Sequence, residues 1–162
     1  MKYFRPTRQL FAEIRQLLPQ KASFHGSAID DVIDLLISGR HYSWVGLYLV
    51  LSGGRQQALA TGGDRPEQMV LPQTRSKVLI SVKTAGRELG VLSVESDRAN
   101  FRAEDRVLLE RVADILARFL SGPGKYLVRK AREQAAKPMP KSQAHVSPAA
   151  AVKPTRSASS GR

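Results

Sequence analysis

The chain of 162 residues contains no cysteine and only one tryptophan. Without cysteine it can form no disulfide, and it offers no thiolate as nucleophile or metal ligand. No stretch approaches the roughly 18 consecutive apolar residues of a membrane-spanning helix, so no such helix is predicted. The first residues also lack the uninterrupted apolar core of a signal peptide, and we expect a cytoplasmic location.

Acidic residues are scarce at the C-terminal end of the chain. Residues 1–122 hold 17 Lys and Arg against 13 Asp and Glu, whereas residues 123–162 hold 9 against 1. Two thirds of the net charge of +12 therefore falls on the last quarter of the chain. From residue 134 onward Ala, Ser, Pro and basic residues dominate. Such a segment buries too little apolar surface to offset the entropy of ordering it, so we expect it to be disordered.

Motifs for catalysis and for metal binding are also lacking. His25, His41 and His145 lie far apart without ligand spacing, so we expect no metal site. The sequence TGGDR at 61–65 lacks the GxxxxGK[ST] pattern of a phosphate-binding loop and is interpreted as a plain turn. No nucleophile elbow or kinase signature occurs, and we expect no cofactor. These absences favour a non-catalytic protein.

The apolar pattern predicts helices and strands in a definite order. Helical spacing predicts one helix after Thr7 that Pro19 ends, a second that Ser27 caps and that leaves through a left-handed Gly39, and a third over 103–120. Alternation predicts strands over 43–51, 56–60, 77–84 and 88–96. Residues 61–75 are expected to form an irregular crossing, and residues 125–133 one or two further helical turns.

Alternate residues of the predicted strands fall on two faces of different character. One face is aliphatic and consists of Val45, Leu47, Leu49, Leu51, Val78, Ile80, Val82, Leu92 and Val94. We predict an α+β fold in which three amphipathic helices bury this face of an antiparallel sheet, which leaves the mixed face for a ligand, a partner or water. A three-residue loop at 85–87 would place Ile80 opposite Leu92 and pair Lys77 with Glu95 as a structural ion pair.

Three stretches of the sequence resemble a GAF domain, the small sensor fold related to PAS. They are GVLSVESDRANFRAEDRVLLERVADILA at 90–117, HYSWVGLYLV at 41–50 and SKVLISVKTAGRELG at 76–90. The resemblance covers about residues 27–121, and its nearest subgroup is the free methionine-R-sulfoxide reductase. It implies a GAF/PAS-like sheet with helices on one face at 27–122, preceded by a helix and connection at 1–26 and followed by a basic tail at 123–162.

The sequence departs from that subgroup in ways that bear on function. Those reductases use cysteines on the segment after the second strand, which is short here and has no thiol, so their thiol-based mechanism is excluded. The subgroup tends to hold an ammonium group with carboxylates at the positions of Lys77 and Glu95, and it commonly has an acidic residue at the position of Ser93. Lys77 reverses the charge at its position. Arg102 stands where a helix cap is usual, which leaves Asn100 or no side chain as the cap.

We therefore expect a non-catalytic sensor or a protein-interaction and dimerisation module, without a membrane span. The candidate ligand residues lie on the mixed face and are Trp44, Tyr48, Lys77, Ser81, Ser93 and Glu95. Alternatively, Trp44 and Tyr48 fill space on the sheet or form a patch for a second subunit.

Two other functions stay open for the chain. One is a divergent relative of the reductases with an unrecognised activity. The other is a nucleic-acid-associated protein held by its basic tail through non-specific contacts of Lys125, Arg129, Lys130 and Arg132. A merely solubilising terminus is the plainer interpretation of these four residues.

Overall fold

The protein, a computed structural model, is described over residues 4–20, 28–64, 76–97 and 101–137. In chain order the elements are α1 (Thr7–Gln20), α2 (Ala28–Arg40), β1 (Trp44–Val50), the short 3-10 helix η1 (Ser52–Gly54), β2 (Gln56–Gly63), β3 (Ser76–Thr84), β4 (Arg87–Ser96), α3 (Ala103–Ser121) and α4 (Lys125–Ala136). The strands form one antiparallel sheet in the order β2-β1-β4-β3. The α+β class predicted from the sequence is confirmed.

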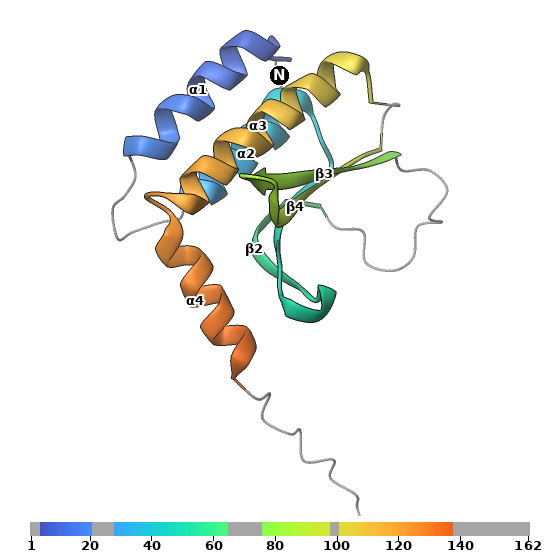
Figure 1. Cartoon of the computed structure of the whole chain (residues 1–162). Helices are drawn as coiled ribbons and strands as arrows, with labels where there is room; N and C mark the ends of the chain where they lie inside the picture. Colours follow the sequence, from blue (N-terminus) through green and yellow to red (C-terminus); the bar gives the residue numbers. More distant parts are fainter. Residues whose placement is uncertain (1–3, 21–27, 65–75, 98–100, 138–162) are drawn as a thin grey trace, which may run out of the picture.

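Two helices cover one face of the sheet, and a third lies outside them. α2 packs on β1 and β2, and α3 packs on β3 and β4, whereas α1 lies against α2 and α3 (Figure 1). The expectation that all three helices dock on the sheet is thus corrected. Two helices, each about 10 Å wide, already cover four strands spaced about 4.8 Å apart. α1 therefore packs on the outer side of α2 and α3. Its Leu10 and Ile14 are fully buried there.

The aliphatic face of the sheet points into the core, as alternation predicts. Val45 and Leu47 of β1, together with Leu92 and Val94 of β4, are fully buried beneath the helices. Burial of such a side chain stabilises the fold by about 1.5–3 kcal/mol. The helix layer therefore fixes which face of the sheet remains open.

The β3–β4 hairpin keeps the predicted register but not the predicted loop. Ile80 pairs with Leu92 and Lys77 with Glu95, as expected. The turn, however, has two residues instead of three, Ala85 and Gly86, at φ 47° and 76°. These angles are typical of the tight hairpin turns that match strand twist. A bulge next to Val82 takes up the remaining residue, so the pairing beyond it is unchanged.

The exit from α2 differs from the prediction. Gly39 lies inside the helix, and the left-handed residue is His41 at φ 59°. Gly39 instead permits the close approach of α1, since a Cβ there would come 3.1 Å from Leu10 Cδ1. The backbone N–H of Arg5 also donates to the Gly39 carbonyl at 2.9 Å.

β2 is longer than predicted and includes residues 61–63 of the expected irregular crossing. Gly62 and Gly63 pair with Val45 and Trp44. Glycine is needed at 63, where φ is 94° and a Cβ would come 2.2 Å from the Ser43 carbonyl oxygen. The rest of the crossing at 65–75 and the predicted caps Ser27 and Asn100 lie outside the described residues.

α3 begins with a different cap from those considered, and α4 extends further than expected. The carboxylate of Asp105, in the first turn of α3, accepts a hydrogen bond from the backbone N–H of Arg102 at 3.0 Å and so caps the start of the helix. α4 continues to Ala136, three residues beyond the helical turns expected at 125–133. Val128 and Ala131 hold α4 because both are buried in the core. Residues 138–162 lie outside the described residues.

Candidate functional site

The open face of the sheet contains a hollow of about 420 Å³. It is lined by residues of all four strands: Trp44, Tyr48, Gln56, Lys77, Leu79, Ser81, Val91, Ser93 and Glu95. The six candidate ligand residues of the sequence analysis are all among them. The volume falls within the range of roughly 300–1,000 Å³ that is usual for small-molecule sites.

The strand register accounts for the composition of the hollow. Three rungs of directly paired residues cross β1, β4 and β3, namely Trp44–Glu95–Lys77, Gly46–Ser93–Leu79 and Tyr48–Val91–Ser81. Paired residues in an antiparallel sheet point to the same face. One face therefore carries the charged pair beside an indole ring at one end, a hydroxyl and Leu79 in the middle, and a phenol ring at the other end.

Gly46 makes room for the aromatic side chains of β1. A Cβ on Gly46 would come 2.7 Å from Cε2 of Tyr48, so the phenol ring lies over the glycine between the outer rungs. Trp44 and Tyr48 are both half-buried. Sequence reasoning did not assign a role to Gly46, although a glycine inside an apolar strand indicates close approach by another group.

The charged rung contains the ion pair predicted from the sequence. Lys77 Nζ lies 3.7 Å from Glu95 Oε1, with the lysine side chain 53% and the glutamate side chain 23% exposed. An exposed pair of this kind contributes about 0–1 kcal/mol to stability, so its position in the hollow matters more than its energy. The Ser93 side chain lies buried on the middle rung. The Ser81 hydroxyl donates to Glu88 Oε1 at 3.0 Å.

Leu79 is the residue of the hollow that sequence reasoning undervalued. It is 59% exposed, the most exposed of the large apolar side chains in the described part of the chain. A signal was available, because alternation places Leu79 on the mixed face with Lys77 and Ser81. Val91 and Gln56 also line the hollow and were not named as candidates.

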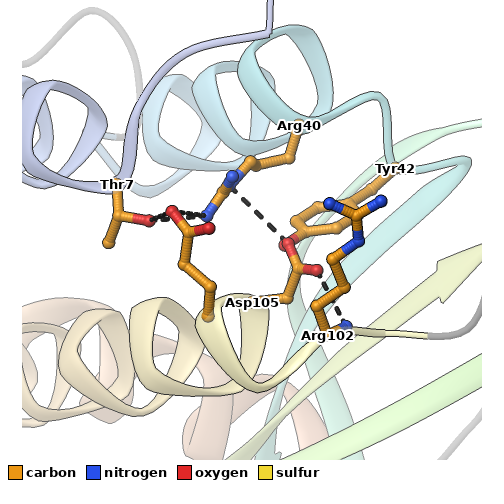
Figure 2. Close-up of polar contacts among 6 residues, drawn as sticks. Thr7, Arg40, Tyr42, Arg102 and Asp105 are labelled. Atoms are coloured by element: carbon orange, nitrogen blue, oxygen red, sulfur yellow. Dashed lines mark hydrogen bonds and ion pairs between the residues drawn. The ribbon is translucent and has the colours of Figure 1, made fainter.

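A second group of polar residues surrounds the buried Arg40 where helices α1, α2 and α3 meet (Figure 2). The Arg40 side chain is only 1% exposed. Its Nη2 donates to Thr7 Oγ1 at 2.6 Å and lies 3.4 Å from Glu104 Oε1. Its Nε lies 3.7 Å from Asp105 Oδ1. One guanidinium thus joins the first turns of α1 and α3 to the end of α2.

The surroundings of Arg40 complete this network. The Tyr42 hydroxyl donates to Asp105 Oδ1 at 2.9 Å. The ring of Phe4 lies 4.4 Å from the guanidinium carbon, a cation–π contact. Sequence reasoning missed the network because its members are up to 98 positions apart, from Thr7 to Asp105, and each is unremarkable in its own segment.

The network shifts the protonation equilibria of two of its members. Burial raises the pKa of Tyr42 far above its usual value, and the neighbouring Asp105 carboxylate adds to the effect. The pKa of Glu104 is lowered, first by the hydrogen bond from the Thr7 hydroxyl and then by the Arg40 guanidinium. Tyr42 therefore stays neutral and Glu104 ionised at neutral pH, which is the arrangement that these hydrogen bonds need.

The described residues form no group of three or more His, Asp or Glu placed to hold a metal ion. Of the three histidines only His41 is described, and its Nδ1 is buried without a hydrogen-bond partner. None of the described helices is long and apolar enough to cross a membrane.

The four basic residues proposed for nucleic acid lie on α4. Lys125, Arg129, Lys130 and Arg132 are all exposed. They line no part of the open-face hollow. The structure thus keeps the two candidate sites separate.

Comparison with solved structures finds the same fold in other proteins. The free methionine-R-sulfoxide reductase of Neisseria meningitidis, in complex with its substrate, superposes with a TM-score of 0.62 at 16% identity, over 74% of this chain and 91% of that one. The GAF domain of the Acinetobacter phosphoenolpyruvate-protein phosphotransferase superposes with a TM-score of 0.60 at 14% identity, over 74% and 96%. The chain has a GAF fold.

A third solved structure extends the comparison. The GAF domain of A. aeolicus nlh2, in an inactive state, superposes with a TM-score of 0.58 at 11% identity, over 71% of this chain and 95% of that one. No model of a protein family matches the sequence. No curated protein matches it either. At identities this low the likeness establishes the GAF fold alone, and function has to be argued from the site.

Proposed function

We propose that this chain is a non-catalytic module with a GAF fold that binds a small molecule in the open-face hollow and acts as a sensor. The observation that carries the proposal is the convergence of three strand rungs on one hollow of about 420 Å³. Aromatic, aliphatic, hydroxyl and charged groups meet there. Four of the nine lining residues are aromatic or aliphatic and five are polar. Apolar surface with convergent polar groups that fix orientation is a feature of small-molecule sites.

The lining indicates the class of ligand. Trp44, Tyr48 and Leu79 offer flat and aliphatic surface to an apolar body. Lys77 and Glu95 offer opposite charges 3.7 Å apart at one end to a polar head group. We therefore assign to the hollow a small amphipathic metabolite.

The chemistry of the lining favours binding over catalysis. The chain has no thiol, and the lysine and carboxylate at the end of the hollow neutralise each other. An ammonium group paired with a carboxylate is a poor base and a poor nucleophile. Reduction of free methionine sulfoxide by the purified protein with a thiol donor would contradict this part of the proposal.

The proposal is tested by asking which compounds the purified protein retains. Ser81→Phe places a ring in the hollow from the exposed strand β3. Lys83→Phe is the matched control, because Lys83 is an exposed residue of the same strand that does not line the hollow. Each protein is denatured after gel filtration, and the released compounds are quantified by mass spectrometry.

We expect the wild type and Lys83→Phe to release one compound in near-stoichiometric amount. Ser81→Phe should release at least about tenfold less, because its ring blocks the site. Thermal unfolding checks that both variants are folded. Equal retention by the two variants would place any ligand elsewhere, and absence of a retained compound from all three would remove the support for sensing.

The exposure of Leu79 favours a second candidate function, association through the open face. An apolar side chain 59% exposed beside Trp44 and Tyr48 suits contact with a second subunit. If so, Leu79→Asp should convert a dimer to a monomer in sedimentation equilibrium, whereas Val107→Asp, at an exposed apolar residue of α3, should not. A wild-type protein that is monomeric at all concentrations rules this function out.

A further inference from the structure

The exposed side of α4 carries a stripe of positive charge. Lys125, Arg129 and Arg132 stand at intervals of four and three residues, so they share one face over about 10 Å at 1.5 Å per residue. Lys130 is also exposed, but about 100° further round the helix from Arg129. Glu133 is the only acidic residue of the helix. The helix therefore presents several cations that the rest of its surface does not neutralise.

The stripe borders a hollow of about 620 Å³ along the helix. Lys125, Arg129 and Arg132 line it together with Tyr126, whose side chain is 44% exposed. Tyr126 is also the only aromatic residue after Phe119 in the whole chain. Val128, Glu133 and Ala136 complete the lining, so three cations face one acid beside apolar groups. The net charge of the lining is positive, which suits an anionic partner.

The packing of α4 decides between two kinds of anionic partner. A basic amphipathic helix binds a membrane surface by burying its apolar side among the lipids. In α4 that side is already occupied, because Val128 and Ala131 are buried in the core and Leu127 packs against it. Apart from Tyr126 and Ala136, the exposed residues of α4 are charged or polar. The guanidinium groups among them are well matched to phosphate oxygens.

We propose that the exposed side of α4 binds the phosphate backbone of a nucleic-acid duplex without reading its sequence. Sequence-tolerant binding of single strands relies on several aromatic side chains that stack on bases, and α4 has one. Contacts to phosphates alone need only cations at the surface. This binding is independent of the open-face hollow, since the two hollows share no lining residue.

Residues 138–162 also contain cations, so any effect of theirs on binding has to be separated from that of α4. They contain Lys141, Lys153, Arg156 and Arg162 and no acidic residue. Each phosphate contact that is formed releases condensed counterions, so the affinity of the full chain falls steeply with salt. The contribution of α4 is therefore separable from that of the tail by substitution.

The test is the fluorescence anisotropy of a labelled DNA duplex of about 20 base pairs, titrated with the full-length protein between about 50 and 200 mM NaCl. The α4 variant is Arg129→Gln with Arg132→Gln. The matched control is Arg87→Gln with Arg106→Gln, which removes the same charge from exposed positions of β4 and α3. A third protein carries Lys141→Gln, Lys153→Gln and Arg156→Gln.

We expect the α4 variant to bind about tenfold more weakly at 100 mM NaCl and to lose about two units of the salt slope, because each lost phosphate contact removes nearly one unit. The control pair should change affinity less than threefold, and the tail variant should weaken binding while leaving the effect of the α4 substitutions in place. Circular dichroism verifies that the helix persists in each variant.

Three outcomes would overturn the proposal. Equal losses in the α4 and control variants would mean that only net charge matters. Loss of binding in the tail variant with no effect of the α4 substitutions would assign the interaction to the tail. Equally tight, α4-dependent binding to phosphatidylserine vesicles would assign the stripe to an anionic membrane instead.

Discussion

Arg40 carries a positive charge in the interior of the molecule, at a side chain that is 1% exposed. A buried charge is tolerated only when hydrogen bonds and opposite charges replace the lost water. Thr7, Glu104 and Asp105 supply these groups from α1 and α3. At the scale of single residues, this guanidinium is the strongest constraint on how α1 sits against the rest of the fold.

Removal of the Arg40 charge should destabilise the protein. Arg40→Met keeps much of the apolar volume but leaves the Asp105 carboxylate without its cation, and we expect the free energy of unfolding to fall by about 2–3 kcal/mol. The loss is smaller than for a fully buried pair because Glu104 and Asp105 keep some contact with water. Urea denaturation measures it.

The control for this substitution is Arg55→Met, at an exposed position after η1. We expect it to change stability by less than about 0.5 kcal/mol. Equal stabilities of the wild type and the Arg40 variant would show that the buried network contributes nothing net.

Glu104 makes the same network sensitive to acid. Its pKa is lowered in the folded protein by the Thr7 hydroxyl and the Arg40 guanidinium. A lowered pKa gives stability that is present above the unfolded pKa, near 4.3, and lost as the pH falls through the folded value. Urea midpoints measured from about pH 6 down to pH 3 should therefore fall more steeply for the wild type than for Glu104→Gln. Parallel profiles would remove Glu104 from the network.

At the scale of elements, the β3–β4 hairpin shows how a local strain is accommodated. Ala85 takes a positive φ of 47° that is unfavourable for a residue with a Cβ, next to Gly86 at 76°. The two-residue turn and the adjacent bulge together keep Lys77 opposite Glu95. The turn thus sets the arrangement of the charged rung, whose Glu95 lies nine residues after Gly86 along β4.

Relief of this strain should stabilise the hairpin. Asparagine tolerates the left-handed region, so Ala85→Asn should raise the free energy of unfolding by about 0.5–1 kcal/mol. Gly86→Ala forces a Cβ into the same region and should lower it by about 1 kcal/mol. Thermal unfolding of the two variants measures both changes. A stabilising Gly86→Ala would contradict the turn geometry.

The elements were predictable where a repeating pattern encodes them. Alternation along β1 and β4 predicted which face of the sheet is buried, the face that carries Leu47 and Leu92. Counting residues back from the hairpin loop predicted that Lys77 pairs with Glu95. The loop was misjudged by one residue because a bulge costs little and leaves no mark in the sequence. The role of Gly39 was missed for a similar reason. A glycine near a helix end suits an exit as well as a contact, and only the position of Leu10 decides between them.

At the scale of the whole molecule, two surfaces of different chemistry lie on different elements. The hollow of the open sheet face is half apolar with one neutralised charge pair, whereas the exposed side of α4 carries four cations against one acid. The sequence indicated both surfaces, because strand faces and charge runs are local properties. It did not indicate the Arg40 network that joins α1, α2 and α3, since Thr7, Arg40 and Asp105 meet only after the chain has folded.

The hollow as a whole could be predicted further than its details. Alternation placed Trp44, Tyr48 and Glu95 on one face, and their pairing follows from the register. The position of the Tyr48 ring over Gly46 and the exposure of Leu79 depend on side-chain packing. The alternation of residues along a strand does not describe that packing.

The proposed function requires that the open sheet face is the ligand site, and the single tryptophan of this face allows a direct measurement. Trp44 gives one indole signal in an ¹H–¹⁵N spectrum of the labelled protein, which is titrated with pooled metabolites of below about 500 Da, a size that suits the hollow. We predict that a binding compound shifts the Trp44 indole together with amides of Lys77–Ser81 and Ser93–Glu95, while α4 amides stay unchanged. Shifts confined to the helices, with the Trp44 indole unmoved, would contradict the account.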